Sequence, residues 1–214
     1  MKKIIIMCVA ALLALQIAQA QGIVYVSNLG QTSTVSESIG SNSWYAANFH
    51  TGNNVGGYIL NYIQLAMTNA SGNPSGFTAM LYGAANIPAA TLPGSSLGTL
   101  NGSLNPVTAG TYTYTAPSNL ILSPSTYYFI VVTAGTSVAN GAYEWSVEDT
   151  SPPFSMGWSQ VNDFFQSSNG SSWIGNLGAL EFAINATAVP EPSSSFLLLL
   201  GSGVLIYVRR AFRR

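Results

Sequence analysis

Alternating hydrophobic and polar positions in the middle of the chain predict β-strands. In residues 142–148, Tyr143, Trp145 and Val147 fall on one side and the polar residues between them on the other, which is the period of a half-buried strand. Residues 127–132 are apolar throughout, as in a strand covered on both faces. Runs rich in Tyr, Val, Ile, Thr and Phe predict strands over residues 22–27, 44–50, 58–67, 77–84, 111–115, 126–133, 142–148 and 178–186.

Dipeptides typical of turns separate these runs. They are Pro93-Gly94, Asn101-Gly102, Asn140-Gly141 and Asn169-Gly170, and Asn-Gly favours tight hairpins because both residues tolerate positive φ. Short strands at this spacing predict an all-β fold, an antiparallel β-sandwich of jelly-roll-like form. We expect one such domain over residues 21–187, and a linker over residues 186–195 that leads to the tail.

The N-terminus has the three parts of a secretory signal peptide. Lys2 and Lys3 precede an almost wholly apolar run over residues 4–15, and the small residues Ala18 and Ala20 flank one spacer. We therefore predict that residues 1–20 are a signal peptide, exported by the Sec machinery and cut by signal peptidase before Gln21. The alternative is a short uncleaved membrane helix, although the run is shorter than the roughly 20 residues that span a bilayer.

The C-terminus predicts a second targeting signal over residues 188–214. A Val189-Pro190-Glu191-Pro192 motif precedes an uncharged run over residues 196–208, and a basic tail follows, made of Arg209, Arg210, Arg213 and Arg214. The run predicts a transmembrane helix with the basic tail on the cytoplasmic side, because loops rich in Arg and Lys are retained there. An ordinary single-pass anchor would have the same topology.

This tail resembles the PEP-CTERM sorting domain, the substrate of exosortases in Gram-negative bacteria. The resemblance implies an exported protein, anchored transiently in the inner membrane by its C-terminal helix, then processed by an exosortase and released to the cell surface or the extracellular space. Proteins with this tail are commonly linked to exopolysaccharide and biofilm matrix, so exopolysaccharide is an implied partner.

The middle of the chain resembles choice-of-anchor domains, most closely type R. The resemblance rests on residues 76–82, 93–94, 97–100, 109–114, 120–132 and 143–147. It implies a sandwich fold in an anchored, extracellular setting. It implies no reaction, because no catalytic residues can be carried over from these domains.

Charge placement excludes some functions. All six Lys and Arg residues lie in the two terminal signals, and six acids and the lone His50 lie between residues 21 and 189. We do not expect nucleic acid as a partner, because phosphate binding needs clustered Lys or Arg. The mature chain has no cysteine, since Cys8 lies in the signal peptide, so disulfides and thiol chemistry are excluded. We expect no cofactor and no metal.

Candidate catalytic groups are sparse. Glu144 and Glu148 on one strand are roughly 13 Å apart, which is long for the carboxylate pair of a glycosidase. His50 is the only histidine for a Ser-His-Asp triad, and the sequence has no Gly-x-Ser-x-Gly elbow that would present the serine nucleophile. Calcium needs only oxygen ligands, and Glu148, Asp149 and Asp163 are candidates for it. We expect a non-enzymatic protein, with a secreted glycan hydrolase as a remaining alternative.

Sugar binding is the better alternative. Residues 154–173 combine aromatic rings with polar side chains, and the residues predicted to contact a glycan are Trp158, Asn162, Asp163 and Trp173. The competing interpretation for each Trp is a place in the core. The sequence therefore predicts an exported structural or adhesive matrix protein, with a carbohydrate-binding module of defined ligand as the second hypothesis.

Overall fold

The computed structural model describes residues 22–31, 33, 35–87, 90–102, 105–118, 120–148 and 156–190. This part of the chain is all-β apart from one short 3₁₀ turn, Val138–Asn140. Its strands are β1 (Ile23–Ser27), β2 (Val35–Ile39), β3 (Trp44–His50), β4 (Tyr58–Met67), β5 (Ser71–Gly72), β6 (Thr78–Ile87), β7 (Ala90–Thr99), β8 (Gly110–Thr115), β9 (Ile121–Leu122), β10 (Tyr127–Thr133), β11 (Gly141–Glu148), β12 (Asp163–Ser167), β13 (Ile174–Leu177), β14 (Ala179–Leu180) and β15 (Phe182–Ala188).

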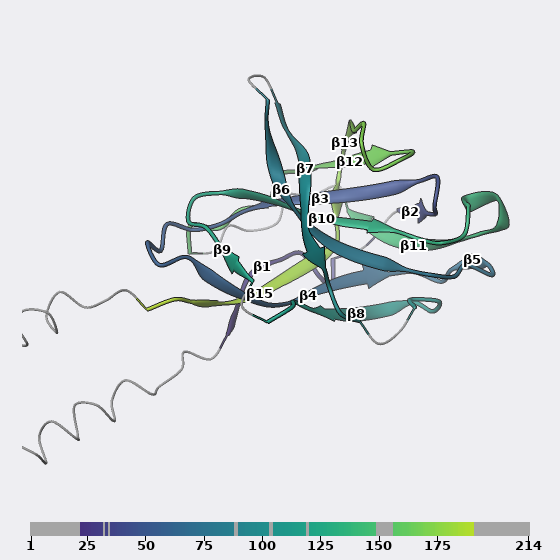
Figure 1. Ribbon diagram of the computed structural model, residues 1–214. Coiled ribbons are helices and arrows are strands. Elements are labelled where there is room, and N and C mark those ends of the chain that lie inside the picture. Colours follow the sequence, from purple (N-terminus) through teal and green to yellow (C-terminus); the bar gives the residue numbers. More distant parts are fainter. Residues whose placement is uncertain are drawn as a thin grey trace, which may run out of the picture.

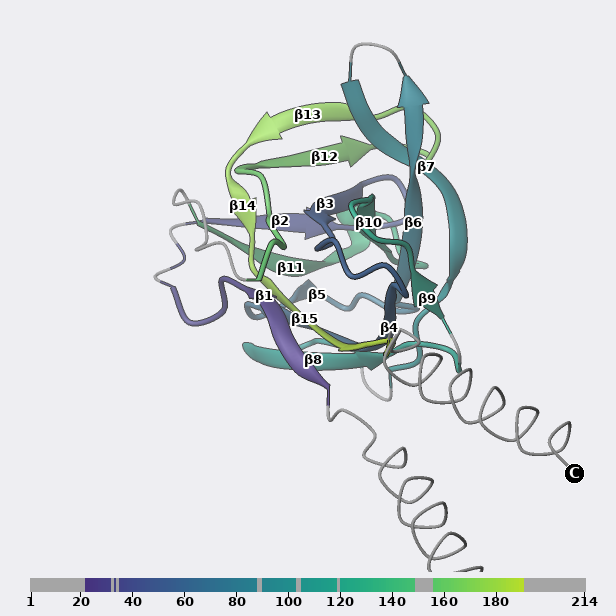
Figure 2. The ribbon, with the colours of Figure 1, turned by 90° about the vertical axis from the view of Figure 1, so that its left-hand side faces the viewer.

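These strands form two antiparallel sheets (Figures 1 and 2). One sheet has the order β13-β12-β3-β10-β6-β7. The other has the order β1-β15-β4-β11-β14, with β2 and β5 also paired to β11 and with β8 and β9 paired to β4. The predicted all-β, antiparallel class is therefore confirmed.

The main core lies between the two sheets. Tyr143, Trp145 and Val147 of β11 are all buried in it, as their alternation predicts. From the other sheet, Ala47 and Phe49 of β3 belong to the same cluster. Both sheets thus bury one face against the other, which is the largest favourable contribution to folding.

The opposite, outer face of the six-stranded sheet carries a second apolar cluster. Because successive side chains of a strand alternate between faces, Ala46 points away from the main core. It joins Met80, Phe129, Val131 and Phe165 in a separate buried group. Trp44, Tyr82, Ala84, Leu92 and Trp173 pack around this group and are partly exposed. The centre of this outer face is therefore apolar, and the pocket described below lies on the same face.

The two ends of the described chain lie side by side. β1 pairs with β15, with Ile23 opposite Ala186, so both ends lie on neighbouring strands of one sheet. β15 continues to Ala188, and the expected linker from residue 186 is wrong for its first residues, because β4 supplies backbone partners as far as Ala188.

Several predictions lie outside the described residues. They are the signal peptide with Ala18, Ala20 and Gln21, the motif residues Glu191 and Pro192, the C-terminal helix, and Arg209, Arg210, Arg213 and Arg214. None of the helices in the described part of the chain has the length and apolar character of a membrane span.

Candidate functional site

A pocket of about 280 Å³ opens on the outer face of the six-stranded sheet. Its lining comes from β3, β7, β10, β12 and the segment before β12, and consists of Asn48, Thr91, Tyr127, Val161, Asp163 and Phe165. The volume is near the lower end for small-molecule sites, about 300 Å³. The pocket therefore suits one small ring at a time.

Asn48 and Asp163 form the polar centre of this pocket. β12 pairs with β3 so that Phe164 lies opposite Ala47, and this register brings Asp163 beside Asn48. The Asn48 amide Nδ2 donates to Asp163 Oδ1, and Asn48 Oδ1 accepts the Val161 N–H at 3.2 Å. Burial raises the pKa of Asp163 above its ordinary value, partly offset by the Asn48 hydrogen bond. The carboxyl group is thus fixed in place and incompletely solvated.

Tyr127 supplies an aromatic surface beside this polar centre. Its side chain is 36% exposed, and the His50 ring lies 4.5 Å from it between centroids. His50 is held in turn by backbone hydrogen bonds with Ser159, at 2.8 and 3.1 Å. An exposed ring next to fixed hydrogen-bonding groups is the usual composition of a small-molecule site.

The prediction that Trp158 contacts a glycan at the surface is wrong. Trp158 is 0% exposed, and its ring stacks on Tyr25 at 4.7 Å and on Phe49 at 5.9 Å. It belongs to the main core between the sheets. A fully buried ring cannot offer a face to a sugar.

The other three residues predicted to contact a glycan lie in different places. Asp163 lines the pocket, and Trp173 packs on the same outer face without lining the pocket. Asn162, which lies in a bend just before β12, is outside the described lining. The sequence analysis missed Asn48, Thr91 and Tyr127, although the alternation of β3 could have placed Asn48 on the face opposite Phe49.

The carboxylates considered for catalysis lie elsewhere. Glu144 accepts hydrogen bonds from Ser38 at 2.8 Å and from Ser36 at 3.0 Å. Glu148 interacts electrostatically with Glu181, and these two residues are only 2% and 3% exposed. They are therefore closed to a substrate.

The oxygen ligands considered for calcium do not gather in one place. Asp163 belongs to the six-stranded sheet, and Glu148 to the nine-stranded sheet, while Asp149 lies outside the described residues. Within those residues, no three His, Cys, Asp or Glu side chains come together.

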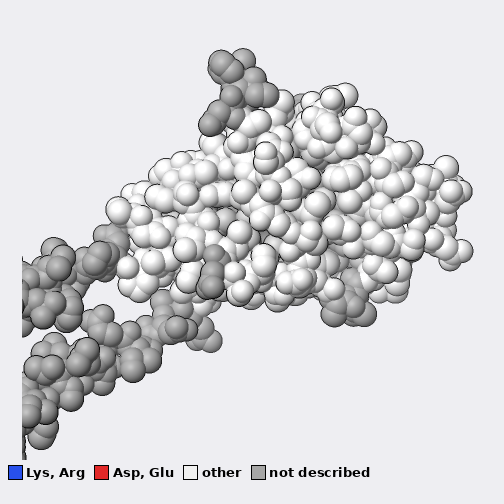
Figure 3. Space-filling model, in the orientation of Figure 1, with Lys and Arg blue, Asp and Glu red and all other residues white. Residues whose placement is uncertain are grey.

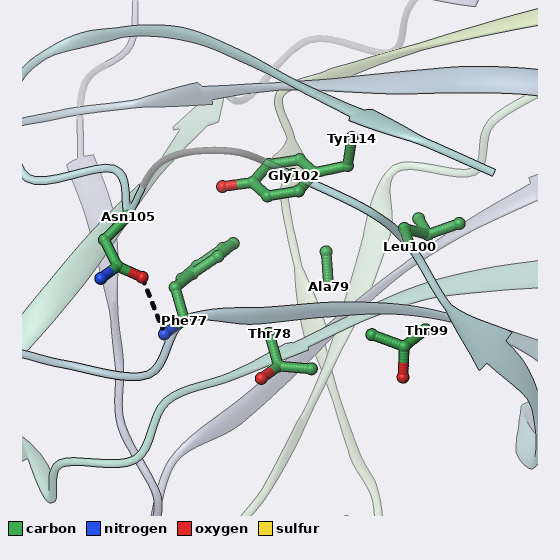
Figure 4. Close-up of a pocket in the computed structure, with 8 residues that line it drawn as sticks. All are labelled: Phe77, Thr78, Ala79, Thr99, Leu100, Gly102, Asn105 and Tyr114. Atoms are coloured by element: carbon green, nitrogen blue, oxygen red, sulfur yellow. Dashed lines mark hydrogen bonds between the residues drawn. The ribbon is translucent and has the colours of Figure 1, made fainter. Parts of the chain in front are cut away.

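A second, smaller hollow of about 170 Å³ is lined in part by residues of the main core (Figure 4). Its lining consists of Phe77, Thr78, Ala79, Thr99, Leu100, Gly102, Asn105 and Tyr114. Asn105 Oδ1 accepts the Phe77 N–H at 3.2 Å, and none of the described lining residues carries a charge. The described residues of this hollow therefore offer a ligand no charged group, whereas the outer-face pocket offers Asp163.

The surface around these features is almost uncharged. All Lys and Arg residues of the chain precede residue 4 or follow residue 208, so the described residues contain neither. On the face drawn in Figure 3, every described residue is uncharged. Hydrogen-bonding side chains, not charges, hydrate this surface.

A backbone clip holds the point at which the sorting motif leaves the domain. Asn54 Nδ2 donates to Gly57 O at 2.7 Å and to Val189 O at 3.0 Å, and the Val189 N–H donates to Gly57 O at 3.0 Å. A Cβ at Gly56 would lie 2.8 Å from Val189 O, so the close approach requires glycine. Val189 is thus fixed to the domain.

Replacing Asn54 with alanine is expected to release this exit. Loss of the two hydrogen bonds should lower the free energy of unfolding by about 1–2 kcal/mol and expose the backbone near Val189 to proteases. Urea denaturation and limited proteolysis of the exported protein measure both effects. The control is the neighbouring Asn53→Ala, at an exposed position. Equal unfolding free energies and equal cleavage rates for the two variants would contradict the role of Asn54 in holding Val189.

Comparison with known proteins identifies the tail. Residues 188–214 match the model of the PEP-CTERM protein-sorting motif, which confirms that prediction. The motif marks the chain as an exported protein that an exosortase sorts, held transiently at the membrane before it reaches the surface. The match begins at Ala188, the last residue of β15. No curated protein and no solved structure matches the chain.

Proposed function

We propose that this protein is a non-catalytic component of the cell surface or extracellular matrix that binds polysaccharide through its outer-face pocket. In this proposal the two sheets form a jelly-roll-like sandwich of the choice-of-anchor kind, and the sorting signal delivers that sandwich to an exopolysaccharide or biofilm matrix. The observation that carries the proposal is the pocket itself, where Asn48 and Asp163 lie beside the exposed ring of Tyr127.

This combination fits a sugar. A pyranose ring presents apolar C–H groups, which pack on an aromatic ring, and hydroxyl groups, which hydrogen-bond to carboxylate and amide oxygens. Tyr127 supplies the ring and Asp163 the acceptors.

A glycan hydrolase is supported less well. Hydrolysis by the usual mechanism needs two carboxyl groups about 5–10 Å apart across the scissile bond. Among the described residues that line the pocket, Asp163 is the only one with a carboxyl side chain. Binding without turnover is therefore the function that the pocket supports best.

The test is retention of the exported protein on a panel of immobilised bacterial polysaccharides. We expect at least one polysaccharide to retain it, and Tyr127→Ala to weaken that binding about tenfold, the cost of one lost stacking contact. Glu144→Gln, on the other sheet, should bind like the unmodified protein. Release of reducing ends from a bound polysaccharide would instead indicate a hydrolase, and no retention on any polysaccharide would reject the proposal.

A further inference from the structure

The described lining of the outer-face pocket carries a single charge. Asp163 is the only charged side chain among the lining residues that the structure describes, and the chain contains no Lys or Arg between residues 4 and 208. An anionic ligand would meet a like charge here and no compensating cation, and such juxtapositions are strongly unfavourable at a binding site. Uronic acid, sulfated and phosphorylated glycans are therefore disfavoured.

The Asp163 carboxylate is oriented to accept hydrogen bonds from a ligand. Among described residues, its hydrogen bond is to Asn48 Nδ2, and the Asn48 amide is itself fixed by the Val161 N–H. Half-burial of Asp163 leaves this carboxylate with less water than an exposed one. Hydrogen bonds with an ionised donor or acceptor are about twice as strong as those between neutral groups. An ammonium donor adds the attraction between opposite charges, which is stronger where water is partly excluded, so a cationic donor gains most from this position.

The rest of the pocket suits the same kind of ligand. The exposed ring of Tyr127 can pack against a sugar ring, and its face attracts a nearby ammonium group through the ring quadrupole. His50 packs against Tyr127 and helps to fix the orientation of its ring. At about 280 Å³ the pocket admits one monosaccharide unit of a longer chain.

Resting on the proposed glycan binding, we propose that this pocket selects amino sugars with a free amine, in which the ammonium group pairs with Asp163 and the sugar ring lies on Tyr127. The ligand class is then a partly or fully deacetylated polymer of hexosamine. N-acetylation would remove both the charge and two N–H donors of the amine.

Titration calorimetry on the full exported protein tests this selection with three oligosaccharides of equal length. They are built from glucosamine, from N-acetylglucosamine and from galacturonic acid. We expect the glucosamine oligomer to bind at least about tenfold more tightly than its acetylated form, and the galacturonic acid oligomer not to bind. Raising the salt from about 0.1 M to about 1 M should weaken only the glucosamine complex, because screening acts on the charge pair.

Asp163→Asn is the matched variant, since it keeps the shape of the side chain and removes the charge. It should weaken glucosamine binding about tenfold and change N-acetylglucosamine binding far less. Should this variant fold poorly, the salt dependence of the unmodified protein still decides. Equal affinity for the glucosamine and N-acetylglucosamine oligomers would overturn the selection while leaving glycan binding in place. Preferred binding of galacturonic acid would overturn the selection too, and binding of no glycan on this or the larger panel would reject both proposals.

Discussion

Replacing Trp158 with alanine is expected to lower the free energy of unfolding by about 3–5 kcal/mol, the usual cost of deleting a large buried ring. Trp158 is fully buried and contacts three rings: it stacks on Tyr25 and Phe49 and meets Tyr58 edge-on at 4.8 Å. Domains are typically stable by only 5–15 kcal/mol, so the variant should lose much of its stability. Urea denaturation followed by circular dichroism measures the loss.

Two further variants separate packing from ligand binding. Trp158→Phe keeps an aromatic ring and removes the indole N–H, which is buried and has no hydrogen-bond partner in the described structure, so it should cost less than Trp158→Ala. Trp173→Ala, on the partly exposed outer face, should cost about 1 kcal/mol. If Trp158→Ala instead keeps full stability and loses glycan binding, Trp158 is a ligand contact and its place in the core is wrong.

The alternation of apolar residues predicted the central strands well. β3 and β4 have the predicted bounds, residues 44–50 and 58–67, because alternate side chains of each strand lie in the core between the two sheets. β7 was missed, and the turn predicted at Pro93-Gly94 is wrong, since both residues lie inside this strand. β7 is an edge strand of its sheet, where proline is tolerated because one side of the strand needs no donor.

The candidate site was harder to predict for a physical reason. Asn48 and Asp163 are 115 residues apart and meet only through the register of β3 with β12, which a single sequence does not contain. Trp158 lies outside the named strands, so no periodicity indicated which way its ring points. The tail was easier, because the order of its motif, apolar run and basic end is local.

A buried pair of acids is the other feature with a large expected effect. Glu148 ends β11 and pairs with Ala179 of β14, so Glu181, two residues further on, is its diagonal neighbour on the same face. Burial raises the pKa of Glu181, and the charge of Glu148 raises it further, whereas a hydrogen bond from the Gly30 backbone lowers it. The described residues contain no Lys or Arg that could neutralise the pair.

Glu181→Gln is therefore expected to stabilise the protein at neutral pH. The pKa of Glu181 is higher in the folded than in the unfolded chain, so its contribution to stability is fully present below the ordinary value of 4.5 and is lost as the pH rises through the folded value. Glutamine cannot ionise, so the variant removes the buried charge and its repulsion with Glu148. At pH 8 it should gain about 1–3 kcal/mol, the usual desolvation penalty of a buried group. Urea denaturation at pH 4 and pH 8 measures the gain, which should be much smaller at pH 4.

The control Glu144→Gln removes a carboxylate that Ser36 and Ser38 already satisfy, and it should give no gain at either pH. An equal loss of stability for Glu181→Gln at both pH values would show that the carboxylate is held by a favourable interaction, and would contradict this account of the pair.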